Sequence, residues 1–306
     1  MGSGGGGYRY FPSSPNELRE LIEKSQNDAA RTASDAAINA YLQSLLAVLN
    51  ERDAKATREV LDGIGQVLAD AVEIDQLLFG GSVAKHTYVD GLSDVDALVV
   101  LDSAKYVDKS STQVLSSMLR QLKKELSSSL YTSIRKGEMA ITIELRTGGE
   151  IQLVPALKEG HQIRVPDRGA GWVTTDPKAF QERLTELNAK LGGTLVPAIK
   201  LMKSIVGEFP DQKRIGGYHV EALAVDAAGQ YSGPNAIKSV VTQLFKHAAG
   251  RVLTPISDVT GQSGAIDSGL GNPGSNVRRI VADALSAVGR RLDAANDVDQ
   301  WKAVFE

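Results

Sequence analysis

Cysteine is absent from this 306-residue sequence. Its absence excludes disulfide bonds, thiolate zinc sites, iron–sulfur clusters and cysteine nucleophiles, and it is typical of a reducing compartment. Aromatic residues make up only 5% of the chain, and the longest apolar runs, such as 97–101, are far too short to span a membrane. The glycine-rich first residues lack the basic and apolar segments of a secretory signal. We therefore expect a cytoplasmic protein without a membrane contact.

Neither sign of charge dominates. The chain has 34 basic and 37 acidic residues, for a formal net charge of −3, which argues against a protein that coats nucleic acid through overall positive charge. The basic pairs Lys123-Lys124 and Arg278-Arg279 are interpreted as solvated helix faces. The 42% apolar content and the length are those of a globular chain with one large or two ordinary domains.

The hydrophobic pattern predicts an α+β fold with a helical C-terminal half. Ser14 and Pro15 have the pattern of a helix start, and helical periodicity continues to residue 49 and again over 54–72. Two short apolar runs, a helical stretch at 109–130 and a β-hairpin follow. From Asp176 and Pro177 onward the pattern is helical. We expect a flexible arm at 1–12, a mixed α/β domain at 13–170 and a helical domain at 171–306.

One segment carries a pattern typical of catalysis. Gly80, Gly81 and Ser82 end the first apolar run, and Asp94 and Asp96 begin the second. Chance alone predicts about four acidic pairs at this spacing in such a chain, so the context decides. On a strand the two aspartates share one face, and carboxylates suit Mg²⁺. A glycine-rich turn lets backbone amides approach phosphate. Together these residues predict two-metal phosphoryl transfer.

Gly-Ser followed about a dozen residues later by Asp-x-Asp resembles the DNA polymerase β-like nucleotidyltransferases. The fuller pattern resembles the cGAS/DncV-like branch (CD-NTases), whose bacterial members make cyclic oligonucleotide signals in anti-phage CBASS systems. The resemblance extends over nearly the whole chain from about residue 15. Besides the catalytic motif it rests on segments 150–156, 197–203, 217–221 and 301–305. It implies a polymerase β-like core with a mixed sheet flanked by helices, plus a C-terminal helical domain that closes the nucleotide cleft.

The resemblance also implies a metal site. Asp94, Asp96 and an acid on the third strand would be the catalytic residues and would hold two Mg²⁺ ions, with Mn²⁺ as a substitute. Many relatives have that acid three residues before a proline, where this chain has Gln152. The polymerase β pattern places it at Glu150, which we expect to be the ligand. Glu144 on the hairpin partner is the reserve candidate.

The same resemblance assigns the nucleotide contacts. Lys203 is expected to reach the triphosphate, with Lys200 on the same helix face as a second candidate, and Tyr218 to stack on the nucleobase. Gly217 and His86 replace residues that are usual in relatives. The complete set of expected nucleotide-binding residues is Gly81, Ser82, Lys200, Lys203 and Tyr218.

The implied activity is the condensation of nucleoside triphosphates into a cyclic di- or oligonucleotide second messenger for anti-phage defence, with release of pyrophosphate. The implied partners are the nucleoside triphosphates and a downstream cyclic-nucleotide-responsive effector, without stable nucleic-acid binding, since the missing cysteines exclude the zinc insertion of animal cGAS. Two alternatives stay open. One is a polymerase-like enzyme that extends a linear oligonucleotide or a tRNA end. The other is a catalytically weak nucleotide sensor or antitoxin-like protein.

Overall fold

The computed structural model of the chain describes residues 14–50, 54–72, 74–79, 81–89, 95–106, 108–146, 148–159, 162–167, 169–258, 260 and 265–306. The expected arm at 1–12 and the candidate ligand Asp94 lie outside these residues, as does Gly80.

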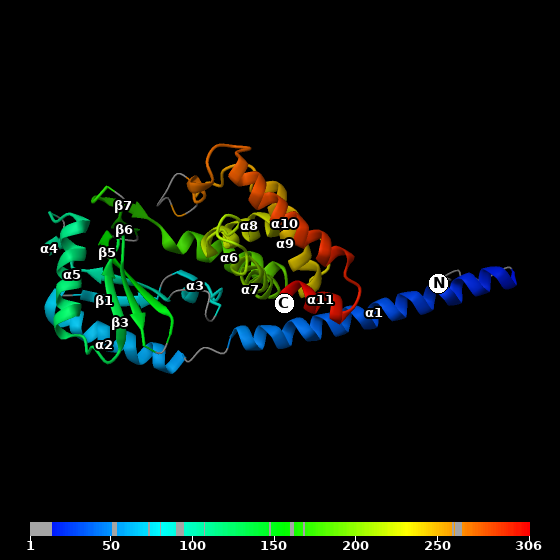
Figure 1. The fold of residues 1–306 in the computed structure, drawn as a ribbon, viewed down its shortest axis with the longest axis horizontal. Helices are drawn as coiled ribbons and strands as arrows, with labels where there is room; N and C mark the ends of the chain where they lie inside the picture. The colour runs from blue at the N-terminus through cyan, green and yellow to red at the C-terminus, as the bar shows by residue number, and fades with distance from the viewer. Residues whose placement is uncertain are drawn as a thin grey trace, which may run out of the picture.

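The first helix is long and only partly packed. Helix α1 (Pro15–Leu49) starts where the sequence predicts, with the Ser14 hydroxyl accepting the Glu17 backbone N–H at 3.3 Å. Its buried residues, Ile38, Leu42 and Leu46, belong to the helical core. Residues 18–33 are exposed, and this part of the helix projects beyond the body of the molecule (Figure 1).

A seven-stranded mixed sheet lies after α1 in the chain, between residues 74 and 175. The strand order is β1-β2-β5-β4-β3, with β6 pairing with both β5 and β7. Only the β2–β5 pair is parallel among the strand pairs of the described residues. The strands are β1 (Ile74–Phe79), β2 (Val95–Leu101), β3 (Tyr131–Lys136), β4 (Ile141–Leu145), β5 (Glu150–Glu159), β6 (Gln162–Pro166) and β7 (Trp172–Thr175).

Four helices, two long and two short, are interspersed with the first strands of the sheet in the sequence. Helix α2 (Ala54–Val72) and α5 (Ser111–Glu125) pack their apolar faces against it, and two short helices, α3 (Gly81–Ala84) and α4 (Ser103–Tyr106), follow β1 and β2. Helix α5 is shorter than the predicted stretch at 109–130, because Leu126 is already extended and β3 begins at Tyr131.

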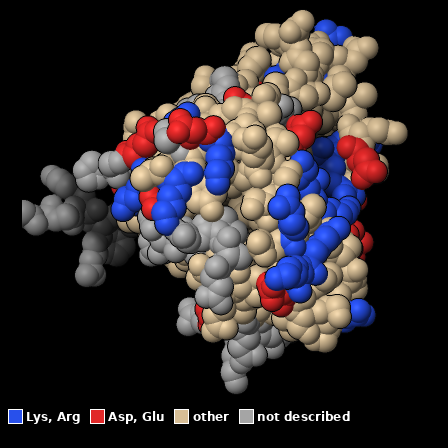
Figure 2. All heavy atoms as spheres, turned by 90° about the vertical axis from the view of Figure 1, so that its left-hand side faces the viewer, with Lys and Arg blue, Asp and Glu red and all other residues tan. Residues whose placement is uncertain are grey.

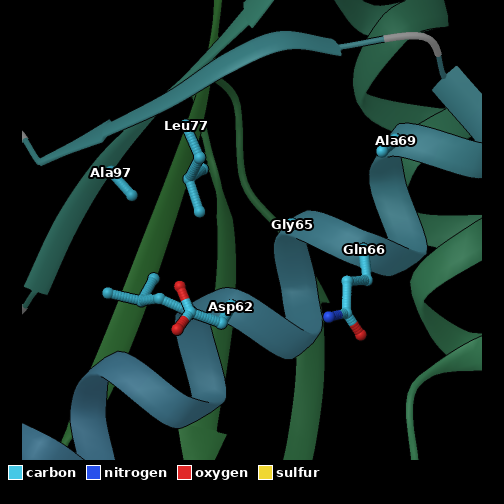
Figure 3. A pocket seen from close by; sticks show the side chains of 7 residues that line it. Asp62, Gly65, Gln66, Ala69, Leu77 and Ala97 are labelled. Atoms are coloured by element: carbon cyan, nitrogen blue, oxygen red, sulfur yellow. The ribbon is translucent and has the colours of Figure 1, made fainter.

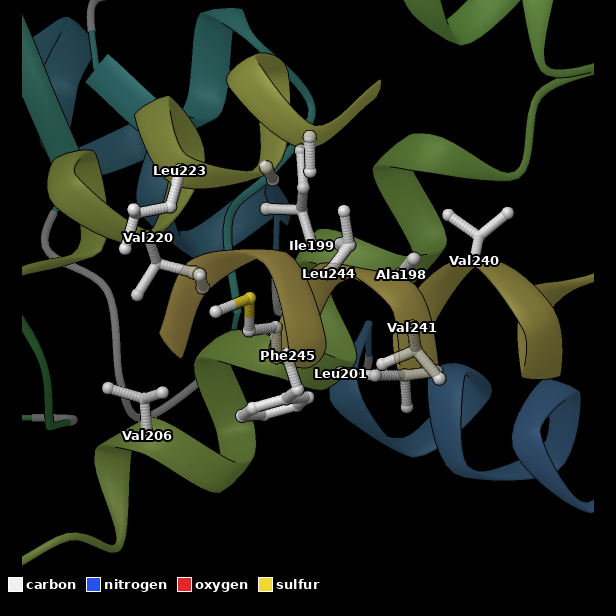
Figure 4. Close-up of a cluster of buried hydrophobic side chains, with 14 of the residues drawn as sticks. Ala198, Ile199, Leu201, Val206, Val220, Leu223, Val240, Val241, Leu244 and Phe245 are labelled. Atoms are coloured by element: carbon white, nitrogen blue, oxygen red, sulfur yellow. The ribbon is translucent and has the colours of Figure 1, made fainter. Parts of the chain in front are cut away.

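The C-terminal half is helical, as predicted. Asp176 caps α6 with Pro177 in its first turn. The elements are α6 (Pro177–Lys190), α7 (Leu195–Gly207), α8 (Gly217–Gly229), α9 (Ile237–Arg251), the 3₁₀ turn η1 (Ser268–Leu270), α10 (Asn276–Ala294) and α11 (Val298–Phe305). Figure 4 shows the close packing of α7, α8 and α9 around Leu201 and Phe245.

Two separate clusters of buried side chains result, one on the sheet and one among the helices. The predicted fold class, a mixed sheet with helices plus a helical C-terminal part, is therefore confirmed. The division at residue 170 stays a prediction. Within the described part of the chain, no helix combines the length and apolarity needed to cross a membrane.

The interpretation of Arg278 as a solvated residue was wrong. Arg278 is fully buried, and its guanidinium donates to Asp267 at 2.7 Å and to the Val252 carbonyl at 2.8 Å. The sequence pattern cannot reveal this, since the acceptors lie on the loop between α9 and α10. Arg279 beside it is exposed. This buried ion pair anchors the loop between α9 and α10.

His219 lies beside the same pair. Burial, with a smaller contribution from the charges of Arg278 and Arg251, lowers its pKa to about 4 against the opposing attraction of Asp267. Its Nε2 is 3.8 Å from Asp267 and has no hydrogen-bond partner among the residues that the structure describes. The imidazole is therefore neutral in the folded protein near neutral pH.

This histidine predicts an acid-sensitive fold. Between pH 6.5 and about 4 the unfolded chain takes up a proton on His219 that the folded chain excludes, so the free energy of unfolding falls as pH falls, by about 3 kcal/mol in total. Urea unfolding measured at several pH values should show this slope, and His219→Gln should remove it. An identical pH profile in the variant would contradict the assignment.

Candidate active site

Gly81 and Asp96 are in direct contact at the start of the site. Gly81 begins α3, immediately beyond β1, and Asp96 is the second residue of β2. The backbone of Gly81 has φ +52, and a Cβ built on it would lie 1.6 Å from Oδ2 of Asp96. Only a glycine satisfies both conditions, because L side chains disfavour positive φ and none fits against the carboxylate. The turn and the predicted metal ligand therefore form one unit.

Gly81→Ala is expected to reduce nucleotide-dependent activity severely, by about a hundredfold or more, because the new methyl group must displace the Asp96 carboxylate. Steady-state kinetics would measure this effect. Gly148→Ala is a matched control, since Gly148 also has a positive φ (+91) but open space around its Cβ position. Equal losses in both variants would show that backbone strain, not the carboxylate, is responsible.

Ser82 and the following turn are held tightly. Ser82 is buried, and its carbonyl accepts the Thr87 N–H at 2.9 Å. The turn between them includes His86, whose φ of 58 lies in the left-handed region. Histidine is among the residues that tolerate this conformation best, and its side chain is exposed. The turn closes the loop on which phosphate binding is predicted.

Lys203 lies behind this turn rather than in the open. Its side chain is 6% exposed, and its ammonium donates to Glu221 at 2.7 Å and to the Thr87 carbonyl at 3.0 Å. Burial lowers the pKa of Lys203, and Glu221 counteracts that effect. A Cβ at Gly217 would lie 3.4 Å from its Cε, so the small residue there leaves the lysine its space. The predicted contact between Lys203 and the triphosphate stays a prediction.

Glu221 joins the two halves of the molecule. Its carboxylate, 1% exposed on α8, accepts from Lys203, from Lys85 and from the Thr87 hydroxyl. Burial disfavours the charged carboxylate, but the two lysines outweigh burial and keep the pKa of Glu221 below its ordinary value. One buried anion thus faces two buried cations directly beneath the Ser82 loop.

Tyr218 lies near this cluster with its hydroxyl anchored. The hydroxyl donates to Asp258 at 2.9 Å, and the ring lies 5.1 Å from the Phe180 ring, at a tilt of 59°. Burial and the hydrogen bond to Asp258 raise the pKa of Tyr218 well above its ordinary value. The ring is thereby held in one orientation, which a stacking platform requires. Its role in base binding stays a prediction.

The candidate third ligands lie on β5 and on its hairpin partner β4, at different distances from Asp96. The parallel register pairs Asp96 with Gln152, and the hairpin register pairs Glu150 with Glu144. Both glutamates face Arg135, which donates to Glu144 at 2.6 Å and to Glu150 at 3.3 Å. The residue directly beside Asp96 is thus the glutamine, while Glu150 lies two positions away on the same strand face.

Lys200, on the same helix as Lys203, contacts the end of α1. Its ammonium donates to the Asn50 side chain at the end of α1. The structure therefore brings together Gly81, Ser82, Asp96 and Lys203, with Tyr218 at one side. Glu150 lies farther along the sheet face, and Asp94 is outside the described residues.

The donor set on this face suits magnesium. Asp96 and Glu150 supply hard carboxylate oxygens from adjacent strands, and Gly81 is kept bare where it meets Asp96. Carboxylates, water and substrate phosphates are the usual ligands of Mg²⁺. Asp96 would therefore hold the metal together with the predicted ligands Asp94 and Glu150. Within the described residues, no group of three acidic or histidine side chains is already clustered.

Sequence reasoning missed Lys85, Thr87 and the function of Glu221. Glu221 stands in the segment 217–221 that carries the family resemblance, but nothing in the sequence shows that it faces Lys85, 136 positions away. Asp258 was also missed, because the glycine- and serine-rich loop that holds it has no regular pattern. These four residues are recognisable only from the folded arrangement.

A separate hollow of about 470 Å³ lies on the other face of β1 and β2 (Figure 3). Leu77 and Ala97 line it from the sheet, and α2 covers it with Leu61, Asp62 and Gln66 among others. Because side chains alternate along a strand, Ala97 points away from the face that carries Asp96. The hollow is therefore not part of the candidate site.

The surface of the α/β half carries a stripe of Lys and Arg with Asp and Glu beside it (Figure 2). Several of the basic side chains in this half are paired, among them Lys124 with Glu125 at 2.5 Å and Arg164 with Glu159 at 3.1 Å. Lys123 and Lys124 are exposed, as interpreted from the sequence. The expected lack of stable nucleic-acid binding stays a prediction.

Comparison with known proteins shows similarity in sequence and similarity in fold. Residues 39–188 match the family model of the Second Messenger Oligonucleotide or Dinucleotide Synthetase (SMODS) domain. The chain is also 23% identical over 222 residues to a probable cyclic nucleotide synthase of Bacillus cereus (strain VD146). That match covers 67% of this chain and 62% of the relative, so the chain spans about three fifths of the relative's length.

Solved structures share the fold at low sequence identity. The CD-NTase CdnG of Bradyrhizobium diazoefficiens, in complex with GTP, has a TM-score of 0.68 and 13% identity, covering 87% of this chain and 95% of that one. CdnC of E. coli MS115-1 with ATP has a TM-score of 0.66 and 16% identity, covering 89% and 97%. These findings confirm the expected resemblance to the cGAS/DncV-like nucleotidyltransferases: residues 39–188 match the SMODS family model, and the chain shares the fold of solved CD-NTases.

Proposed function

We propose that this protein is a nucleotidyltransferase that condenses nucleoside triphosphates into a cyclic di- or oligonucleotide and releases pyrophosphate. The observation that carries the proposal is the contact between Gly81 and the Asp96 carboxylate. It places the loop predicted to bind phosphate directly beside a predicted metal ligand on β2. The SMODS match over residues 39–188 supports the same class of product.

The proposed reaction divides among few residues. An acceptor hydroxyl attacks the α-phosphorus, a new P–O bond forms, the bond to pyrophosphate breaks, and the hydroxyl proton leaves to a base. The amides around Gly81 and Ser82 bind and orient the triphosphate, and Asp96, with Asp94 and Glu150, would hold two magnesium ions. When bound, Mg²⁺ would neutralise charge on the phosphates and lower the pKa of the attacking hydroxyl. Tyr218 orients the base by stacking, and a second turnover closes the ring.

The decisive experiment incubates the full chain with labelled ATP, GTP, CTP and UTP, singly and mixed, with Mg²⁺ or Mn²⁺. The expected result is a phosphatase-resistant product that does not form in the presence of EDTA. Chromatography against linear and cyclic standards then separates ring formation from extension of a linear end. Failure to form any product, together with thermal stabilisation by nucleotides, would favour a nucleotide sensor instead.

Glu150→Gln is expected to lower the rate about a hundredfold or more, as for loss of a charged transition-state contact, whereas Gln152→Ala should lower it far less. Rates measured over a range of Mg²⁺ concentrations would also show a weaker apparent metal affinity for Glu150→Gln. If Gln152→Ala has the larger effect, the third position next to Asp96 belongs to Gln152 and the proposed ligand set is incorrect.

The biological setting follows from the proposed product. A cyclic oligonucleotide acts through an effector that responds to it, and anti-phage defence in the cytoplasm is the setting proposed here. The sensor alternative draws on Gln152, which occupies the register position opposite Asp96 with a neutral side chain where an acid would bind metal more strongly.

A further inference from the structure

Lys85 is a largely buried cation that the proposed reaction leaves without a function. It follows α3 directly, three residues after Ser82, and its side chain is 11% exposed. Its ammonium does not remain with the phosphate loop but reaches the helical half, where it pairs with Glu221. Because burying an ammonium group is costly unless it is paired, the position of Lys85 is tightly defined.

Two aromatic rings complete the surroundings of this ammonium. Nζ of Lys85 lies 4.9 Å from the centroid of the Tyr218 ring and 4.9 Å from that of the Phe180 ring. Both distances are within the range of cation–π attraction, which strengthens when the cation is desolvated. Lys85 therefore contacts the predicted base platform from a segment that belongs to the phosphate loop.

Glu221 fixes the other side of the same ammonium. The carboxylate also accepts from Lys203 and from the Thr87 hydroxyl, and Thr87 closes the turn that begins at Ser82. Lys85 thus connects the Ser82 loop to α8 through two contacts: an ion pair with Glu221 and a cation–π contact with the Tyr218 ring.

We propose that Lys85 is a positioning residue that sets the Tyr218 ring relative to the Ser82 loop, so that the base and the triphosphate of one nucleotide are held at once. This inference rests on the proposed function, since it requires a nucleotide to bind between these two points. Lys85 itself does not touch the phosphates, because its ammonium is occupied by Glu221 and the rings.

The chain offers a clean variant for a test. Lys85→Met keeps most of the side-chain length and removes the charge, while Glu221 stays paired with Lys203, so the fold should survive. Lys85→Arg keeps the cation. Lys246→Met is the matched control, since Lys246 forms its ion pair with Asp293 on the surface of the helical half, away from the site.

Titration calorimetry distinguishes an effect on base binding from an effect on phosphate binding. The ligands are nonhydrolysable analogues of ATP, GTP, CTP and UTP with Mg²⁺ and, separately, inorganic tripolyphosphate. Lys85→Met should weaken the preferred analogue about tenfold, the size of one lost stacking contact, and tripolyphosphate less than about twofold. Lys85→Arg should bind the analogue more tightly than Lys85→Met, and Lys246→Met should match the wild type.

A second comparison tests whether Lys85 acts through the ring. In a Tyr218→Leu background, Lys85→Met should cost little further affinity, because the platform it orients is gone. The same tenfold loss in both backgrounds, an equal loss for tripolyphosphate, or no loss at all would overturn the inference. Lack of analogue binding by the wild type would instead contradict the proposed function, and it would be seen before any substitution is made.

Discussion

Asp96→Asn is expected to lower the rate of nucleotide transfer about a thousandfold, because an amide replaces the carboxylate that is proposed to bind metal. The metal site is expected to contribute several kcal/mol of transition-state stabilisation. The side chain keeps its shape, so the contact with Gly81 remains possible. Product formation from labelled triphosphates at saturating Mg²⁺ would measure the loss, with thermal unfolding as the check on folding.

A matched control lies at the other end of the same strand. Asp102 directly follows β2 and accepts the Ala104 N–H at 3.0 Å, a bond that asparagine can also accept. Asp102→Asn should therefore leave the rate within about twofold of the wild type. If Asp96→Asn retains a rate within about tenfold of the wild type, the metal assignment fails.

Glu221→Gln is expected to destabilise the fold by about 3–5 kcal/mol, because removing one partner of a buried ion pair leaves its charge uncompensated. In this protein two ammonium groups, those of Lys85 and Lys203, would face the neutral amide. Urea unfolding at neutral pH measures the loss. The comparison is Asp293→Asn, which breaks the exposed pair with Lys246 and should cost less than about 1 kcal/mol.

A double variant separates charge from packing in this result. Combining Glu221→Gln with Lys85→Met leaves one unpaired buried cation instead of two, so the double variant should be more stable than Glu221→Gln alone. A loss that is unchanged or larger in the double variant would mean that the shape of Glu221, and not its charge, holds the two halves together.

Local signals in the sequence predicted local structure well. The helix starts at Ser14 and Asp176 depend on residues within a single turn, and both caps form. The short strands β6 and β7 were not predicted. Strand β3 was missed too, because only Ile134 of its residues is buried, so it lacks the alternation that marks a half-buried strand.

The site divides in the same way. Gly81, Ser82 and Asp96 lie within one short segment, and the structure brings the glycine and the aspartate into contact. Lys85 and Glu221 acquire their importance from a contact across 136 positions, and Arg278 from a loop carbonyl and a carboxylate in a segment without periodicity. Such buried charges look like ordinary surface residues in a sequence, since their partners come from elsewhere in the fold.

The projecting part of α1 affects how the molecule moves through solvent. Residues 18–33 form a rod about 24 Å long at 1.5 Å per residue, longer than the radius of gyration of about 19 Å expected for a compact chain of this length. The rod adds friction far from the centre of mass while adding little mass. The protein should therefore diffuse and tumble more slowly than a sphere of its 32.6 kDa, because of this one exposed helix.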